Sequence, residues 1–232
     1  NGCMAKLYFI TARTDLNKPL SESGAVFIVP SDTPGFKPDF FHEKSSQRLA
    51  TNGCFHLQDC KIPAKNILLG EGKLIELRGK YMPGSKAEAA ATVLGVGRSA
   101  YEYAFNYAKK RKQGGKMIID HQAVAMMISK MTMLLDGARL QIWKAAWLAD
   151  NHHPDARIQG LISKVRASEA AFEVCTLATE ILGGAGIMYN HPIEKYLRDA
   201  TSFLHSDGTN QICSLRVTKA LVSDDQSKLY GF

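Results

Sequence analysis

One acidic side chain stands where a predicted turn meets a predicted helix. Asp207 lies in the stretch Ser206-Asp207-Gly208-Thr209-Asn210-Gln211. Local chemistry favours an Asp-Gly turn, with Thr209 as the N-cap of the helix that follows. A carboxylate on a turn that faces a helical bundle is also suited to general base catalysis, and a helix N-terminus is suited to holding a phosphate. The spacing leaves both interpretations open.

Two further stretches have the composition of ligand-binding segments. Gly183-Gly184-Ala185-Gly186 follows a predicted helix and lacks the G-x-G-x-x-G spacing, so a helix C-cap explains at least one of its glycines. Adjacent glycines also give a flat ligand room to approach the backbone. The densest basic stretch, residues 109–112 with Lys116, is either a solvated helix end or an anion site for a phosphate-bearing ligand.

The remaining reactive side chains predict neither a metal site nor a nucleic-acid site. His121 begins a predicted helix, and His152-His153 lies in a loop without acidic partners at metal-ligand spacing. The 5 cysteines form no C-x-x-C pair, which argues against zinc and against a disulfide framework. We therefore expect a reducing compartment, the cytoplasm or, in a eukaryote, the mitochondrial matrix. Aromatic residues do not interleave with the basic ones, as a nucleic-acid platform requires.

Composition places the chain among folded globular proteins. It has 232 residues, of which 45% are hydrophobic and 22% are charged, with a formal net charge of +7. A disordered chain would have fewer apolar residues. No apolar run approaches the roughly 20 residues that cross a bilayer, so we expect no membrane helix. No signal peptide precedes Leu7, where apolar residues begin at once, so we expect the chain to start inside a structural unit.

The predicted secondary structure that positions these residues changes from strands to helices near residue 86. Before it, residues 5–11, 25–30 and 55–62 predict short strands separated by turns. After it, apolar residues recur at three and four positions, as in amphipathic helices. The predicted helices cover residues 93–107, 121–150, 155–182 and 209–222. Long helices joined by short breaks pack as antiparallel neighbours, so the fold class is α+β, with a β segment before a bundle of about four helices.

Several segments together resemble the acyl-CoA dehydrogenase family of flavoproteins. Residues 107–122 are similar to its pattern Y-A-x-x-R-x-x-F-G-K…Q, and residues 180–186 to Q-I-L-G-G-x-G. Residues 192–200 are similar to P-x-E-[KR]-x-x-R-D-A, and residues 207–212 to E-G-T-x-Q-I. Upstream, residues 47–48 and 55–63 resemble the β-domain run that ends in F-E-D-V-x-V-P, and Asn1-Gly2 resembles the tail of W-I-T-N-G. Each segment is weak alone, but together they follow the family's order over nearly the whole chain.

The resemblance implies an acyl-CoA dehydrogenase-like fold, a partial β-barrel domain followed by an antiparallel four-helix bundle. We expect the β domain at residues 1–72, incomplete at its N-terminus, a linker at residues 73–85 and the bundle at residues 86–232. The family's N-terminal helical domain is then absent from this chain. The resemblance also implies a homotetramer or homodimer.

The family reaction is the FAD-dependent α,β-dehydrogenation of an acyl-CoA thioester. A carboxylate removes the α-proton while the β-hydrogen leaves as hydride to the flavin, and the matching carboxylate here is Asp207. Electron-transfer flavoprotein is the implied electron acceptor, and Lys86 is the nearest candidate for a contact with coenzyme A. The positions that hold FAD in the family, often from a neighbouring subunit, correspond to Arg111, Lys112, Gln113, His121, Gln122, Glu180, Ile181, Leu182, Gly183, Gly184, Gly208, Thr209, Asn210 and Gln211.

Some positions depart from the family pattern. Asp207 replaces glutamate and reaches roughly 1.5 Å less far, one C–C bond. Because a misplacement of about 1 Å can cost about a hundredfold in rate, either the backbone lies closer to the substrate or the substrate is bulkier. Relatives with aspartate here include dehydrogenases of cyclic acyl-CoA thioesters and nitroalkane oxidases. Gly114 replaces phenylalanine and Glu180 replaces glutamine. The arginine that the family usually has before the first helix of the bundle is missing, and Lys86 is its nearest substitute.

Two alternatives stay open beside the dehydrogenase. One is a flavin-dependent oxidase or monooxygenase on the same fold, similar to nitroalkane oxidase. The other is a non-catalytic helical-bundle module for assembly. Both flavoenzymes predict bound flavin, and the assembly module predicts none.

Overall fold

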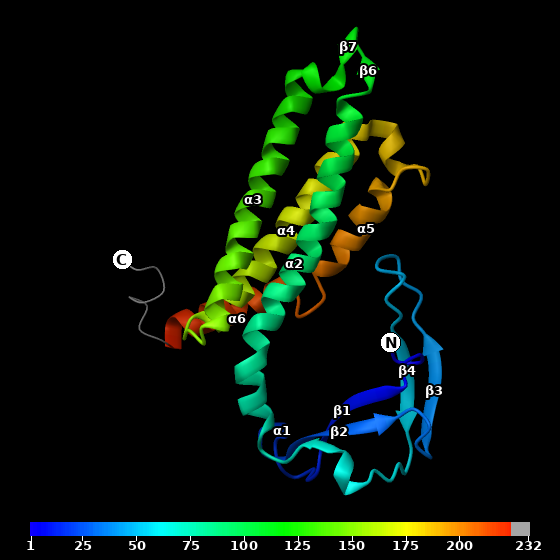
Figure 1. Ribbon diagram of the computed structural model, residues 1–232, viewed down its shortest axis with the longest axis vertical. Coiled ribbons are helices and arrows are strands. Elements are labelled where there is room, and N and C mark those ends of the chain that lie inside the picture. Colours follow the sequence, from blue (N-terminus) through cyan, green and yellow to red (C-terminus); the bar gives the residue numbers. More distant parts are fainter. Residues whose placement is uncertain (224–232) are drawn as a thin grey trace. The chain divides into compact units, whose positions relative to one another are not determined.

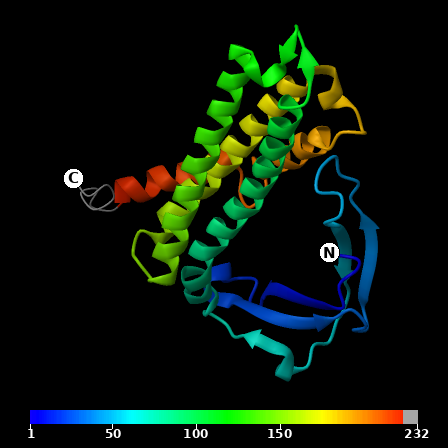
Figure 2. The ribbon, with the colours of Figure 1, turned by 45° about the horizontal axis from the view of Figure 1, so that its top comes forward.

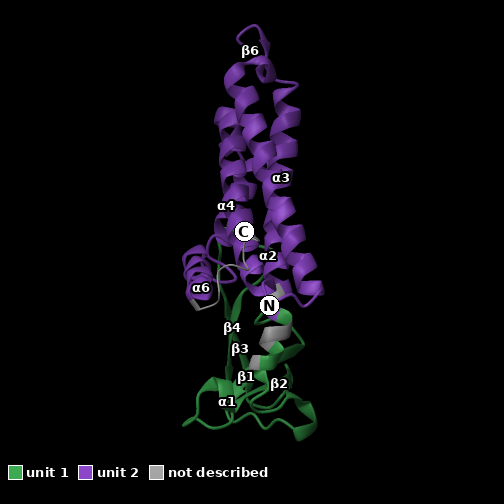
Figure 3. Cartoon of the chain, turned by 90° about the vertical axis from the view of Figure 1, so that its left-hand side faces the viewer, with its two compact units in different colours: residues 1–81 green, residues 82–232 purple. Residues whose placement is uncertain are grey.

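The computed structural model describes residues 1–223, apart from the side chains of residues 75, 78–80, 83 and 223. The end of the expected bundle, residues 224–232, lies outside the described residues. Contacts divide the chain into two compact units, Asn1–Tyr81 and Met82–Phe232 (Figure 3). Helix α2, Leu74–Ala108, contributes to both units.

The first unit contains two small antiparallel sheets. Strands β1, β2 and β5 form one sheet in the order β1-β2-β5, with Leu7 opposite Pro30 and Arg13 opposite Gly24. Strands β3 and β4 form the other. The described residues show no closed barrel. The elements are β1 (Leu7–Arg13), α1 (Leu20–Ser23), β2 (Gly24–Pro30), β3 (Phe36–Phe41), β4 (Gly53–Leu57), η1 (Ala64–Asn66) and β5 (Ile67–Leu69).

The core of the first unit is aromatic. The ring of Tyr8 lies 4.6 Å from that of Phe36 and 5.0 Å from that of Phe55, measured between centroids. In β1, Tyr8 is buried between exposed Leu7 and Phe9, because successive side chains of a strand point to opposite faces. The predicted strands at residues 5–11 and 25–30 are confirmed, while the one at residues 55–62 ends at Leu57 because the chain turns at Asp59, whose φ is +52°.

The second unit is a helical bundle. Helices α2, α3 and α4 lie side by side, with the β6–β7 hairpin at one end of α2 and α3 (Figures 1 and 2). Helices α5 and α6 both pack on α4. The remaining elements are β6 (Lys112–Gln113), β7 (Lys116–Met117), η2 (Ile118–Asp120), α3 (Gln122–Asp150), α4 (Ala156–Leu182), η3 (Gly183–Ile187), α5 (Ile193–Phe203) and α6 (Asn210–Ser223).

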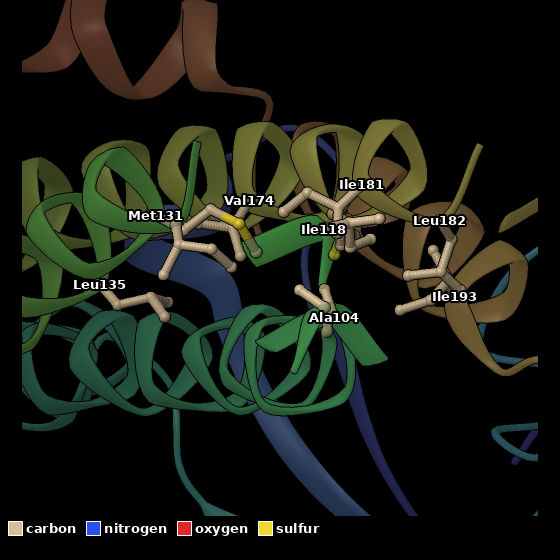
Figure 4. Packing of buried hydrophobic residues seen from close by; sticks show 14 residues of the cluster. Ala104, Ile118, Met131, Leu135, Val174, Ile181, Leu182 and Ile193 are labelled. Carbon is tan, nitrogen blue, oxygen red and sulfur yellow. The ribbon is translucent and has the colours of Figure 1, made fainter. Parts of the chain in front are cut away.

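One buried apolar cluster joins the three long helices (Figure 4). Ala104 of α2, Met131 of α3 and Val174 of α4 are each 0% exposed. Small residues let α2 approach α4 closely, since a Cβ on Gly97 would lie 3.1 Å from the Cα of Ala171. The predicted antiparallel bundle is therefore confirmed, with α5 as an additional short helix.

Two expectations need correction. The linker expected at residues 73–85 is helical, because α2 already begins at Leu74, which is buried, and runs through Gly84. Second, no segment long and apolar enough to cross a bilayer was expected, but residues Ala156–Ile187, helix α4 with η3, have that length and composition. Many residues of α4, from Ala156 to Leu182, are buried against the neighbouring helices of the bundle.

Candidate active site

Asp207 occupies a tight turn between α5 and α6. Its φ is +54° and that of Gly208 is +87°, so two successive residues are left-handed. Aspartate tolerates this region better than most residues do. The amide of Asn210 donates to the carbonyl of Leu204 at 3.0 Å and closes the loop. The carboxylate of Asp207 is exposed.

The helix after this turn begins as the sequence predicts. The hydroxyl of Thr209 accepts a hydrogen bond from the amide of Ile212 at 3.2 Å, which confirms the N-cap. Gln211 is exposed in the first turn of α6, whereas Asn210 is buried. The turn interpretation of this stretch is thus confirmed, and it is compatible with a base at Asp207.

Two lysines bind the turn from inside the bundle. The Lys86 ammonium, on α2, donates to the backbone carbonyl of Asp207. The Lys164 ammonium, on α4, donates to the carbonyl of Gly208 and to Oδ1 of Asn210, both at 2.8 Å. The Lys86 ammonium thus already has a partner within the protein, and its expected contact with coenzyme A stays a prediction.

Lys164 is 1% exposed and was not predicted as a site residue. Burial lowers its pKa below the ordinary 10.5, and the nearby charge of Lys86 lowers it further, while Cys213, Asp207 and Glu169 act in the opposite direction. A signal was present in the sequence, because Lys164 lies three residues after Leu161 on the apolar face of its helix.

The β6–β7 hairpin brings together other predicted site residues. Gly114 and Gly115 have φ values of +61° and +82°, as a two-residue type I′ turn requires. His121 contacts the carbonyl of Gln113 through Nε2 at 2.9 Å, which ties the start of α3 to β6. The side chains of Arg111, Lys112, Gln113 and Gln122 are exposed around this hairpin.

The glycine-rich segment ends α4. Gly183 has φ +58° and ψ −135°, a conformation that favours glycine, so the predicted C-cap is confirmed at this residue. A Cβ at Gly183 or Gly184 would meet no atom within 4 Å, so the space above both is open. Glu180 is exposed, but the side chains of Ile181 and Leu182 lie in the core (Figure 4). Only the backbone of those two residues is therefore suited to a ligand.

A cavity of about 770 Å³ connects the basic stretch to the glycine-rich segment. The Tyr103 hydroxyl lies 2.8 Å from Nδ1 of His191, and the Tyr107 ring meets that imidazole edge-on. Tyr103 and His191 were not predicted, because residues 88 positions apart leave no local signal. The cavity is lined by Tyr103, Asn106, Tyr107, Lys110, Arg111, Ala185 and His191.

The predicted site residues form two separate groups in this chain. One surrounds the hairpin and η3, and the other surrounds the connection between α5 and α6, towards the opposite end of the bundle (Figure 1). Within the described part of the chain, no group of three or more His, Cys, Asp or Glu side chains could hold a metal ion.

Comparison with known proteins identifies the family. Residues 82–222 match the model for the acyl-CoA dehydrogenase C-terminal domain. The chain belongs to the acyl-CoA dehydrogenase family. Across 222 residues it is 32% identical to a probable acyl-CoA dehydrogenase, YngJ, of Bacillus subtilis (strain 168), covering 96% of this chain and 58% of that protein.

Other relatives and a solved structure are similar to the chain over the same length. The chain is 29% identical to cyclohexane-1-carbonyl-CoA dehydrogenase of Geobacter metallireducens, covering 97% of this chain and 58% of the relative. The structure of butyryl-CoA dehydrogenase from Megasphaera elsdenii aligns with a TM-score of 0.90 and 31% identity, over 96% of this chain and 57% of that one. The chain thus spans somewhat over half the length of these relatives, and the resemblance and fold inferred from its sequence are confirmed.

Proposed function

We propose that the protein containing this chain catalyses the FAD-dependent α,β-dehydrogenation of an acyl-CoA thioester, with Asp207 as the base. The observation that carries this proposal is the Asp207–Gly208 turn. An exposed carboxylate is presented on a left-handed turn whose backbone is bound from within the bundle. Membership of a family of flavin oxidoreductases supports it.

Asp207 would act on the carbon next to the thioester carbonyl. One carboxylate oxygen accepts the α-proton, while the β-hydrogen leaves as hydride and the C–C bond becomes a double bond. Bound FAD supplies the acceptor for that hydride. A base that acts in this way must be held in line with the reacting bond, and the hydrogen bonds that fix the backbone of the turn support this role.

The residues around the hairpin and η3 fit the phosphate-bearing part of FAD. Arg111 lines the cavity there, and its planar guanidinium pairs well with phosphate oxygens. The open space above Gly183 and Gly184 admits a flat group against the backbone. We assign to FAD the first group, Arg111, Lys112, Gln113, His121, Gln122 and residues 180–184, together with the second group, residues 208–211.

The separation of the two groups supports an assembly of several copies. A cofactor beside Asp207 would contact residues 208–211 of one copy and the hairpin of another. We therefore propose a homodimer or homotetramer, with electron-transfer flavoprotein as the acceptor for electrons from the reduced flavin.

The test is flavin reduction in the purified intact protein under anaerobic conditions. We expect a flavin absorption spectrum that bleaches when straight-chain or cyclic acyl-CoA thioesters are added, without oxygen consumption in a matched aerobic run. Oxygen consumption with substrates other than CoA thioesters would favour the oxidase. A protein that binds no flavin would favour the assembly module.

A matched pair of variants tests the base. Asp207→Asn should keep its flavin but lose reduction by substrate, because the amide cannot accept the proton. Asp59→Asn is the control, since Asp59 is also exposed and also left-handed, with φ +52°. Equal reduction rates in the two variants would overturn the assignment of Asp207.

A further inference from the structure

Two buried ammonium groups converge on the turn that carries Asp207. Lys86 is 7% exposed and Lys164 is 1% exposed. They come from different helices, and they bind the carbonyls of two consecutive residues, Asp207 and Gly208. No step of the proposed reaction uses either lysine directly.

Burial of a charged ammonium is costly unless hydrogen bonds replace the lost water. Two such groups side by side also repel each other, and both effects lower the pKa of Lys164. The turn provides the compensation, since Lys164 binds the Gly208 carbonyl and Oδ1 of Asn210. Ser168 donates to the same Oδ1 at 3.1 Å, so Asn210 is fixed as well.

The turn has an uncommon backbone conformation, which the hydrogen bonds to its carbonyls help to fix. A left-handed conformation is uncommon for residues other than glycine, and Asp207 adopts it directly before a left-handed Gly208. The inner side of the turn presents carbonyls to the lysines, while the Asp207 carboxylate is exposed. Fixing both carbonyls therefore limits the positions that the carboxylate can take.

We propose that Lys86 and Lys164 are positioning residues for Asp207, which hold the backbone of the turn so that the carboxylate stays in line with the α-proton. This inference rests on the proposed function of Asp207 as the base. The two lysines reach the turn from α2 and α4, so the long helices of the bundle set the position of the base.

Lys86→Met tests the proposal, because methionine keeps an apolar stem but has no donor for the Asp207 carbonyl. We expect the limiting rate of flavin reduction by acyl-CoA to fall about 10- to 100-fold, as for a misplacement of about 1 Å. Flavin content should change by no more than about twofold. The dissociation constant of the substrate should also stay within about twofold, because the Lys86 ammonium donates to the turn. A weakened substrate affinity with an unchanged limiting rate would instead support the expected contact of Lys86 with coenzyme A and overturn the positioning role. Lys86→Arg restores a donor and should recover most of the rate.

Lys65→Met is the control, because Lys65 is exposed and the chemical change is the same. A purely structural role for Lys86 would lower the folded, flavin-bound fraction and leave the rate per bound flavin at the parent value. That result overturns the proposal. Lys164→Met should act in the same direction, and if it fails to fold, the two Lys86 variants decide.

Asp207→Asn in the same assay separates this inference from the function on which it rests. If Asp207→Asn reduces flavin at the parent rate, the proposed base is wrong. If Asp207→Asn is inactive while Lys86→Met is as fast as the parent protein, the base stands and the positioning role fails.

Discussion

Replacement of Gly97 by alanine tests how closely α2 approaches its neighbours. The new Cβ would lie 3.1 Å from the Cα of Ala171 and 3.2 Å from Cδ2 of Leu135, closer than most Cβ contacts. Overpacking of this kind costs about 1 to 3 kcal/mol. Alanine is better than glycine in a helix by about 1 kcal/mol, which offsets part of the loss. We therefore expect a net loss of about 0 to 2 kcal/mol in the free energy of unfolding.

Gly95 offers a matched control two residues earlier in the same helix. A Cβ there would meet no atom within 4 Å, so Gly95→Ala should gain up to about 1 kcal/mol. The two variants should differ by about 1 to 3 kcal/mol in unfolding by denaturant, followed by far-UV circular dichroism. Each kcal/mol corresponds to about 2 to 4 °C in Tm for a chain of this size. Equal stability of the two variants would refute the close approach of α2 to α4.

Other perturbations test the site and the core. Arg111→Ala should weaken FAD retention about 10- to 100-fold in a flavin-release titration, as loss of a charged hydrogen bond predicts, whereas Arg98→Ala on α2 should not. Gly208→Ala should destabilise the protein by about 1 to 2 kcal/mol, because alanine disfavours a φ of +87°. A steric clash does not contribute, since the new Cβ would lie an ordinary 3.5 Å from Sγ of Cys213. Burial, with Asp199 nearby, raises the pKa of Cys175 to about 12 from 9.0. The folded state then holds this proton more tightly than the unfolded state, so stability present below pH 9.0 should be lost towards about pH 12, more in the parent than in Cys175→Ala.

Periodicity predicted α3 and α4 well because apolar residues recur at three and four positions along both. Helix α3 buries one face, whereas α4 is buried on several sides because α3, α5 and α6 all pack on it. The short elements gave weaker signals. Strand β3 is mostly exposed and contains Pro38, so it shows no alternation, and β5 has only three residues. A linker was expected at residues 73–85 because the helical periodicity of the apolar residues begins only near residue 86. Leu74 and Ala87 are buried on either side of that stretch, and α2 continues through it.

The site could be predicted only as far as local chemistry extends. The N-cap at Thr209 and the C-cap at Gly183 depend on neighbouring residues, and both were visible in the sequence. The contact between Lys86 and Asp207 joins residues 121 positions apart, and that between Lys164 and Gly208 joins residues 44 positions apart. Such pairs depend on how the helices pack, which the sequence of each helix does not contain.

The role of Asp207 is tested most directly by comparing Asp207→Glu with Asp207→Asn in single-turnover flavin reduction. Glutamate keeps a carboxylate but displaces it by roughly 1.5 Å, one C–C bond, so the rate should fall up to about 100-fold. Asparagine removes the proton acceptor and should lose about 100- to 10,000-fold, the usual contribution of a general base. We predict the order parent, glutamate, asparagine at equal flavin content. An asparagine variant as fast as the parent protein would contradict the assignment of Asp207 as the base.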